Sequence, residues 1–322
     1  MNRLKGLILT VSIAVIATIL GTWLPIIGSA IFAIVIGMII GNIWRVPDTF
    51  QSGIKFSSKK VLHYSIIVLG FTLSFQSIGS VGWKSLPIIF ITLIVAFLIV
   101  YLLLKLLHID ENIGILIGVG TSICGGSAIA ATSAKESEVA FSISTVFLFN
   151  LIAVFIFPPM GHLFHMSQTA FGYFSGTAIN DTSSVIAASS IYGHQALQTG
   201  AIVKLTRTLM IIPVVLFFAV RTMNKMKSKD ANVSIVKIFP WFIVGFILAS
   251  LISTVFNFSP AVIHVFQKIS LFFISIAMAG IGLGVNFKQF KEAGFKPILL
   301  GLITWFVVIV SSLVTMWFTH LW

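Results

Sequence analysis

Long apolar stretches dominate the chain, and short hydrophilic turns separate them. Because a helix needs about 20 apolar residues to cross a bilayer, stretches of this length mark candidate membrane spans. A scan predicts eleven segments, near residues 5–24, 27–44, 61–78, 84–107, 112–134, 137–159, 168–193, 197–220, 238–257, 261–285 and 297–319. Proline falls at several boundaries, as at Pro25, Pro47 and Pro260. The pattern predicts an all-α polytopic membrane protein.

Two of these segments contain the same polar interruption. Residues 120–131 read Gly-Thr-Ser-Ile-Cys-Gly-Gly-Ser-Ala-Ile-Ala-Ala, and residues 176–188 read Gly-Thr-Ala-Ile-Asn-Asp-Thr-Ser-Ser-Val-Ile-Ala-Ala. Hydrocarbon offers no hydrogen bonds, so irregular backbone at membrane depth must be buried in protein or line a wet cavity. Broken helices of this kind are typical of secondary transporters. The repeated break therefore favours a transporter.

A second similarity relates the stretch 70–84 to the stretch 280–297. Gly70-Phe71-Thr72-Leu73 followed by Gly82-Trp83-Lys84 matches Gly280-Ile281-Gly282-Leu283 followed by Gly294-Phe295-Lys296-Pro297. The two members of each similar pair run in opposite directions across the membrane if segments 112–134 and 168–193 are re-entrant hairpins that do not cross it. The first hairpin would then open to the cytoplasm and the second to the outside. Broken helices that cross the membrane are the alternative. We expect an extra N-terminal helix at 1–26, a first repeat at 27–160 and a second repeat at 161–322.

Composition supports the membrane assignment. The chain is 58% apolar and 9% charged, with a mean hydropathy of +1.10. The net charge of +12 comes from Lys and Arg clustered in short loops, which is the bias of cytoplasmic loops and makes nucleic acid an unlikely partner. This bias predicts a cytoplasmic N-terminus. No small-x-small cleavage site precedes Pro25, so we expect the first helix to be retained.

Three charged residues fall inside the apolar segments and are candidates for function. A charge within the bilayer costs on the order of 3 kcal/mol, so those retained there usually serve function. Asp181 lies in the second break, and Lys204 and Arg207 are three residues apart on one helical face. The two basic residues can neutralise an anion, Arg207 with a two-pronged hydrogen bond. The alternative is that Asp181 pairs with them and holds the helices together.

The breaks add polar groups to this candidate site, because helix N-termini expose N–H groups that favour anions. The expected substrate-binding residues are Thr121, Ser122, Cys124, Gly125, Gly126, Ser127, Asn180, Thr182, Ser183, Lys204 and Arg207. For the coupling ion, Asp181 is either a proton carrier or a sodium ligand together with Asn180 and Thr177. Asn150 stands on segment six where Arg207 stands on segment eight, so it either completes this site or forms an interhelical hydrogen bond.

Other chemistry has little support in the sequence. We find no Ser-His-Asp constellation, phosphate-binding loop or paired catalytic carboxylates, so we do not expect an enzyme. Among the histidines, only His162 and His165 have metal-ligand spacing, and we expect neither a metal site nor an organic cofactor. The single cysteine, Cys124, cannot form an internal disulfide.

The two motifs at 120–131 and 176–188 resemble those of the YeiH-type bacterial inner-membrane family, whose members are labelled sulfate exporters. The resemblance covers nearly the whole chain. More distantly, residues 69–74 followed by 120–135 resemble the first repeat of bile-acid/sodium symporters and of the cation-antiporter and anion-transporter group. That likeness implies inverted repeats, breaks that meet near the membrane midplane, and an elevator-like or rocking exchange of access. Here the second motif follows segment six directly, as in a permuted second repeat, so sodium ligands cannot be carried over.

The sequence thus predicts a secondary transporter of a small anion. The resemblance implies sulfate, sulfite or an organosulfonate as substrate, and coupling to H⁺ or Na⁺ is left open. A cation/proton antiporter centred on Asp181 and an anion channel are the alternatives. The expected partners are a small anionic substrate and the lipid bilayer, with a homo-oligomer left open.

Overall fold

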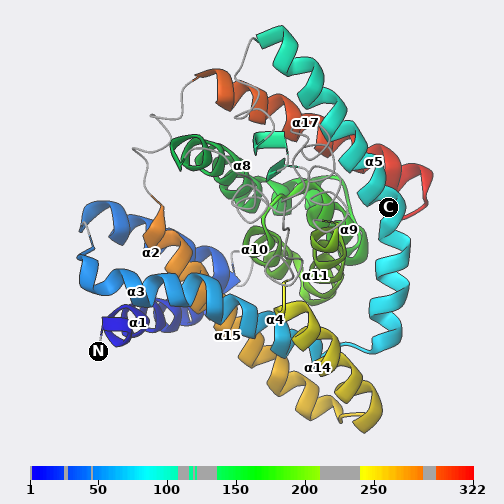
Figure 1. Ribbon diagram of the computed structural model, residues 1–322. Coiled ribbons are helices and arrows are strands. Elements are labelled where there is room, and N and C mark those ends of the chain that lie inside the picture. Colours follow the sequence, from blue (N-terminus) through cyan, green and yellow to red (C-terminus); the bar gives the residue numbers. More distant parts are fainter. Residues whose placement is uncertain are drawn as a thin grey trace, which may run out of the picture.

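The described part of the chain is entirely helical between its turns (Figure 1). The structure is a computed structural model, and it describes residues 2–24, 28–44, 46–107, 116–118, 120–121, 136–210, 240–285 and 295–322. Its helices are α1 (Asn2–Trp23), α2 (Gly28–Ile43), α3 (Asp48–Phe56), the π-helix η1 (Ser57–Val61), α4 (Leu62–Gly70), α5 (Phe75–Leu107), α8 (Glu136–Leu163), α9 (Gln168–Ala178), α10 (Thr182–Tyr192), α11 (His194–Leu209), α14 (Phe242–Phe256), α15 (Pro260–Gly284) and α17 (Phe295–Phe318).

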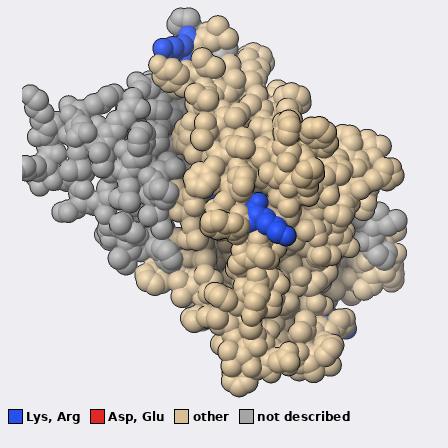
Figure 2. All heavy atoms as spheres, turned by 90° about the vertical axis from the view of Figure 1, so that its right-hand side faces the viewer, with Lys and Arg blue, Asp and Glu red and all other residues tan. Residues whose placement is uncertain are grey.

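Several of these helices are long and apolar enough to cross a bilayer. Among the described residues, five stretches meet this condition by length and composition: Arg3–Trp23, Phe75–Leu106, Thr145–Leu163, Pro260–Gly284 and Phe295–Phe318. α2 and α14 are shorter apolar helices. Figure 2 shows a face on which few Lys or Arg side chains interrupt the uncharged surface. The prediction of an all-α polytopic membrane protein is confirmed.

The boundaries predicted for the third and fourth segments, 61–78 and 84–107, are wrong. The helical run α3–η1–α4 begins at Asp48 and ends at Gly70, and α5 already begins at Phe75. A scan for apolar stretches misses the first half of that run because it carries Lys55, Lys59 and Lys60. It also misses the turn between α4 and α5, because this turn has no charged residue and contains Phe71 and Leu73.

Some predicted segments lie wholly or partly outside the described residues. Of the broken segment 112–134, only residues 116–118 and 120–121 are described. Segment 197–220 corresponds to α11 up to Leu209 and a described turn residue, Met210, and its remainder is likewise outside.

The helices form two groups that lie side by side (Figure 1). The first group contains α1 to α4, α14 and α15, and the second contains α5, α8 to α11 and α17. Glycines allow close contact within the first group: a Cβ at Gly37 of α2 would lie 2.6 Å from the carbonyl oxygen of Ala279 on α15. α10 is the element of the second group that packs against both α2 and α15 of the first.

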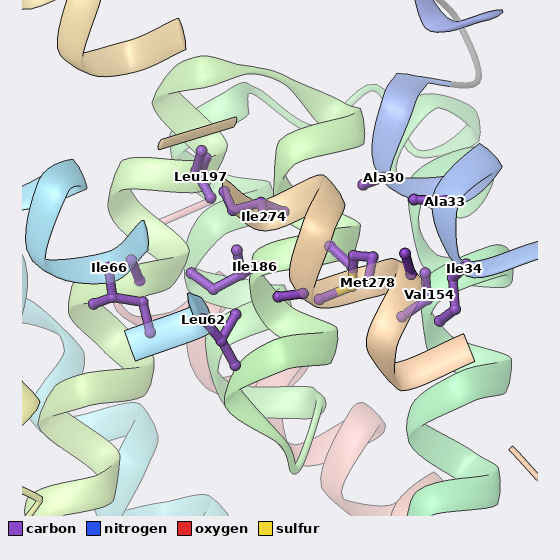
Figure 3. Close-up of a cluster of buried hydrophobic side chains, with 14 of the residues drawn as sticks. Ala30, Ala33, Ile34, Leu62, Ile66, Val154, Ile186, Leu197, Ile274 and Met278 are labelled. Carbon is purple, nitrogen blue, oxygen red and sulfur yellow. The ribbon is translucent and has the colours of Figure 1, made fainter. Parts of the chain in front are cut away.

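Much of the contact between the two groups is apolar. Figure 3 shows side chains of the first group, among them Ile34 and Met278, facing Val154 and Ile186 of the second. All four are buried. Between helices in a bilayer, close van der Waals packing of such side chains stabilises the contact. Hydrogen bonds add to this contact, since the backbone N–H of Phe75 at the start of α5 donates to Thr254 Oγ1 of α14 at 2.9 Å and Gln198 Nε2 of α11 donates to the Thr72 carbonyl at 3.0 Å.

α4 and α15, which carry the second pair of similar sequences, run antiparallel to each other. Ser270 of α15 donates a hydrogen bond of 2.9 Å to the carbonyl of Ser65, while Gly280 lies beside Ser58, nearer the opposite end of the same helical run. The Ser250 hydroxyl of α14 donates a hydrogen bond to the carbonyl of Leu73, just after the end of α4. The division into repeats at 27–160 and 161–322 stays a prediction.

α2 binds a carbonyl just after α15 in the same way that α14 binds the Leu73 carbonyl just after α4. Asn42 Nδ2 donates a hydrogen bond of 3.0 Å to the carbonyl of Val285. A side chain of α14 and one of α2 thus each bind a carbonyl just beyond the end of α4 and of α15, respectively.

Candidate functional site

Residues 168–192 form a hairpin whose two arms return to the same end of the molecule. Phe171, near the start of α9, stacks on Tyr192, the last residue of α10, with ring centroids 3.9 Å apart. The Tyr192 hydroxyl donates to the carbonyl of Met166 at 2.5 Å, and the backbone N–H of Gln195 donates to Gln168 Oε1 at 2.9 Å. A broken helix that crossed the membrane would place these residues at opposite ends. For this segment the geometry is that of a re-entrant hairpin.

Each arm of the hairpin has 11 residues, a length of about 16 Å. This is about half of the 30 Å hydrocarbon core, so the tip lies deep between the crossing helices. The arm α9 runs parallel to α11 and lies close to it, since a Cβ at Gly172 would meet Thr199 and one at Gly176 would meet Val203. Gly172 and Gly176, the first residue of the second motif, therefore allow α11 to pack closely on α9 up to the tip.

At the tip, the carbonyl end of α9 meets the N–H end of α10. Ile179 and Asp181 have extended backbone conformations that reverse the chain between the two helices. Asp181 is the N-cap of α10: its Oδ2 accepts from the backbone N–H of Ser184 at 3.2 Å and from the hydroxyl of Ser183. Such a cap satisfies exposed N–H groups at the start of a helix. The carboxylate of Asp181 is therefore engaged with α10.

Three successive carbonyls at the end of α9 each accept a hydrogen bond from another helix. Arg207 Nη1 donates to Thr177, Trp305 Nε1 to Ala178 at 3.2 Å, and Lys204 Nζ to Ile179 at 2.9 Å. The last carbonyls of a helix lack partners within it and carry partial negative charge. The basic side chains of α11 thus neutralise the end of α9. Lys204 and Arg207 are both 0% exposed.

Arg207 also reaches the first Gly-Thr motif. Its Nη2 donates a hydrogen bond of 2.7 Å to the carbonyl oxygen of Thr121, the residue that corresponds to Thr177 in the repeated sequence. The two nitrogens at the end of one guanidinium thus bind the equivalent carbonyls of both motifs. Arginine suits this role because its planar group presents several donors in fixed directions.

Asn180 occupies the middle of the tip and is 1% exposed. Its backbone N–H donates to Asn150 Oδ1 on α8 at 2.9 Å. Its side-chain Nδ2 and Oδ1 are both buried and have no hydrogen-bond partner among the residues that the structure describes. Asn150 thus forms an interhelical hydrogen bond, one of the two roles the sequence allowed it.

The structure gathers many of the predicted site residues at the hairpin tip. Those described there are Thr121, Asn150, Thr177, Asn180, Asp181, Thr182, Ser183, Lys204 and Arg207. Ser122, Cys124, Gly125, Gly126 and Ser127 lie outside the described residues. Whether the gathered residues bind a substrate or a coupling ion stays a prediction.

Two residues of α17 at the tip were not predicted. Trp305 caps Ala178, and the Ser312 hydroxyl lies 2.5 Å from the hydroxyl of Thr177. Trp305 falls in the middle of an apolar segment rather than at a membrane boundary. A tryptophan at such a depth needs an acceptor for its N–H, and this signal could have indicated it.

Most oxygen atoms at the tip that could bind the predicted coupling ion already have hydrogen-bond partners. Thr177 Oγ1 is hydrogen-bonded within α9, to the carbonyls of Tyr173 and Phe174, as well as to Ser312. In the described part of the chain, no three His, Cys, Asp or Glu side chains are grouped so that they could hold a metal ion. Carbonyl and carboxylate oxygens are the usual ligands of hard cations, and here cationic or N–H donors already bind several of them.

A half-length buried hairpin among apolar crossing helices defines a polytopic α-helical membrane protein with a re-entrant segment. The chain belongs to the family described as Conserved hypothetical protein 698, whose family model matches residues 5–301. The relatives it resembles are named UPF0324 membrane proteins. The family expected from the two Gly-Thr motifs is thereby confirmed.

Relatives from several bacteria align along almost the entire chain. A UPF0324 membrane protein of Fusobacterium nucleatum is 46% identical over 336 residues, which cover 97% of each chain. One from Streptococcus agalactiae is 44% identical over 323 residues, with 97% of this chain and 96% of the relative covered. One from Streptococcus pyogenes is 43% identical with the same coverage. No solved structure matches the chain.

Proposed function

We propose that the protein is a secondary transporter of a small anion, with its substrate site at the tip of the α9–α10 hairpin. One observation carries this proposal: a lysine and an arginine, each 0% exposed, meet at a break in a re-entrant hairpin. Ionisable groups at membrane depth are costly and usually mark a substrate or ion path. A hairpin tip shared with a second Gly-Thr motif is the arrangement in which transporters place such a path.

The charge at the tip favours an anion. Among the side chains described there, Lys204 and Arg207 contribute two positive charges and Asp181 contributes one negative charge. The partial charges of the α9 carbonyl end and the α10 N–H end oppose each other, so they leave this balance nearly unchanged. A buried excess of positive charge is unfavourable unless an anion compensates it.

The cation-antiporter alternative has less support. A cation at the tip would compete with Lys204 and Arg207 for the carbonyls of Ile179 and Thr177. It would also have to displace the hydrogen bonds that Ser183 and Ser184 donate to Asp181. Coupling to H⁺ or Na⁺ at another place in the molecule is compatible with an anion site here. We accordingly propose alternating access for the anion, with the coupling ion left open.

The proposal is tested by the thermal stability of the purified full-length protein in detergent with sulfate, sulfite, bicarbonate, nitrate or taurine. A ligand at about a hundred times its dissociation constant stabilises the folded state by about 2.7 kcal/mol. We expect at least one oxyanion to raise the melting temperature of the wild type. We expect this rise to disappear in Lys204→Met and in Arg207→Met.

Lys84→Met is the matched control, because Lys84 is exposed on α5 and its replacement removes the same charge. This variant should keep the full response to the anion. The proposal is wrong if no oxyanion stabilises the wild type, or if Lys204→Met and Arg207→Met respond as strongly as Lys84→Met. A rise that depends on Na⁺ alone and is lost in Asp181→Asn would instead favour the cation antiporter.

A further inference from the structure

The unpaired amide of Asn180 is the most unusual polar group in the described part of the molecule. It is 1% exposed, and neither Nδ2 nor Oδ1 has a hydrogen-bond partner. A buried amide without partners is costly, whereas an apolar side chain of the same size would cost little. The backbone N–H of the same residue is satisfied by Asn150. The side chain is therefore positioned by the fold but left without a bonding partner.

The surroundings of this amide are those of an anion site. The next residue, Asp181, caps the N-terminus of α10, and the preceding carbonyl, that of Ile179, binds Lys204. The helix end and the buried basic residues attract negative charge. The amide is a second, independent feature of the same tip, and it calls for a ligand with hydrogen-bonding groups of its own.

The chemistry of the amide limits which anions fit. Nδ2 offers two donors, which suit the oxygens of any oxyanion, but Oδ1 is an acceptor and needs a donor from the ligand. A fully deprotonated oxyanion has no donor and would place an oxygen against Oδ1. An oxyanion with a hydroxyl group satisfies both ends of the amide. A site built to bind such a hydroxyl discriminates strongly against analogues that lack it.

The charge at the tip also favours a monoprotonated oxyanion. Among the side chains described at the tip, Lys204, Arg207 and Asp181 carry one more positive than negative charge. A single negative charge compensates it, whereas a dianion would bury a net negative charge in its place. Both the donor requirement and the charge requirement are met by the monoprotonated form of a small oxyanion.

We infer that the hairpin tip selects a singly charged oxyanion that carries its own hydroxyl donor, which binds Oδ1 of Asn180. Hydrogencarbonate, hydrogensulfite and dihydrogen phosphate belong to this class, whereas sulfate and nitrate do not. The inference rests on the proposed anion site and adds its substrate class. Asn180 acts as the residue that determines specificity, while Lys204 and Arg207 supply the charge.

The test compares sodium bicarbonate with sodium nitrate and sodium sulfate as ligands of the purified full-length protein. Hydrogencarbonate and nitrate are both planar monoanions and differ in the hydroxyl group, so they form a matched pair. We expect hydrogencarbonate to bind at least about tenfold more tightly than nitrate, as one buried hydrogen bond can provide. Sulfite offers a second series, because its apparent affinity should fall about tenfold per pH unit above the pKa of hydrogensulfite.

Asn180→Leu removes the amide and keeps the approximate size of the side chain. We expect hydrogencarbonate to lose its advantage over nitrate in this variant, while the melting temperature without ligand stays the same or rises. Asn150→Leu is the structural control, because it removes the acceptor of the Asn180 N–H and should lower the unliganded melting temperature.

The outcomes separate this inference from the proposed function. If nitrate or sulfate binds the wild type as tightly as hydrogencarbonate and hydrogensulfite, the inference is overturned and the anion site stands. The same holds if Asn180→Leu keeps the full preference for hydrogencarbonate. If no anion in the series binds, the proposed function itself fails.

Discussion

Arg207 donates a hydrogen bond of 2.7 Å to the carbonyl oxygen of Thr121, which lies 86 residues earlier in the chain. The same guanidinium binds Thr177 in the second motif, so one side chain joins the two breaks that the repeated sequence predicts. This link gives the repeated Gly-Thr pair a physical meaning. The threonine in each motif provides a backbone carbonyl at a break, and α11 provides the shared donor.

Replacing Arg207 by Lys should destabilise the protein although the charge is kept. A single ammonium cannot reach the Thr121 and Thr177 carbonyls in the two directions that the guanidinium spans. Leaving one buried carbonyl without a partner costs about 1–3 kcal/mol. Thermal unfolding in detergent measures the loss. Arg3→Lys is the control, because Arg3 is exposed and its replacement should change stability by less than about 0.5 kcal/mol; equal effects of the two replacements would contradict the role given to Arg207.

Trp305→Phe should also destabilise the hairpin tip. It removes the N–H that binds the carbonyl of Ala178 and leaves that carbonyl unpaired, at a cost of about 1–3 kcal/mol. Trp317→Phe is a matched control on the same helix, since Trp317 is 66% exposed. The comparison needs only the melting temperatures of the two variants and the wild type. Similar melting temperatures for both variants would show that the Trp305 bond adds no stability.

Gly37→Ala should weaken the packing of α2 on α15. The added Cβ would lie 2.6 Å from the Ala279 carbonyl oxygen and 3.1 Å from Gly282 Cα, so the two backbones must separate. Overpacking of this kind typically costs about 1–3 kcal/mol. Gly79→Ala on α5 is the control, because nothing lies within 4 Å of its added Cβ, and alanine in a helix is favoured over glycine by up to about 1 kcal/mol. The prediction is wrong if Gly37→Ala melts at the same temperature as Gly79→Ala.

The hairpin predicts that both of its ends face the same side of the membrane. Cysteines placed at Phe164 and Gln195, both exposed positions, should be labelled from the same side by a reagent that does not cross the membrane. The native Cys124 is first replaced by Ala so that each protein has one reactive thiol. A cysteine at Lys105, at the far end of the crossing helix α5, should be labelled from the opposite side.

Labelling of Phe164→Cys and Gln195→Cys from opposite sides would mean that segment 168–193 crosses the membrane, against the contacts between Phe171 and Tyr192. The charge bias of the loops further predicts that the Lys105 position is cytoplasmic and that the two hairpin positions are outside. This part of the result tests the predicted orientation of the N-terminus separately from the hairpin.

The sequence was sufficient to predict much of the fold because a bilayer imposes a simple length rule on apolar helices. The rule failed at 61–78, where the helix from Asp48 to Gly70 begins in a stretch with three lysines. Hydropathy responds to such charges, whereas the helical backbone continues through them because its hydrogen bonds are internal. The short turn after Gly70 is made of residues that are also common within spans.

The core of the candidate site was also predictable, since Asp181, Lys204 and Arg207 are charges within apolar sequence. Their hydrogen-bond partners were not. Trp305 reaches Ala178 from 127 residues away, a contact that no local pattern encodes. The same applies to the unpaired amide of Asn180, because a missing partner is a property of the three-dimensional surroundings.

The most direct test of the central claim is counterflow in proteoliposomes. Vesicles loaded with unlabelled sulfite or bicarbonate at high concentration are diluted into a trace of the same labelled anion. A carrier with its site at the hairpin tip predicts a transient accumulation of label that saturates with concentration, persists in Lys84→Met and disappears in Lys204→Met. Flux without saturation or accumulation would indicate a channel, and uptake no greater than in protein-free vesicles would contradict the transporter proposal for these anions.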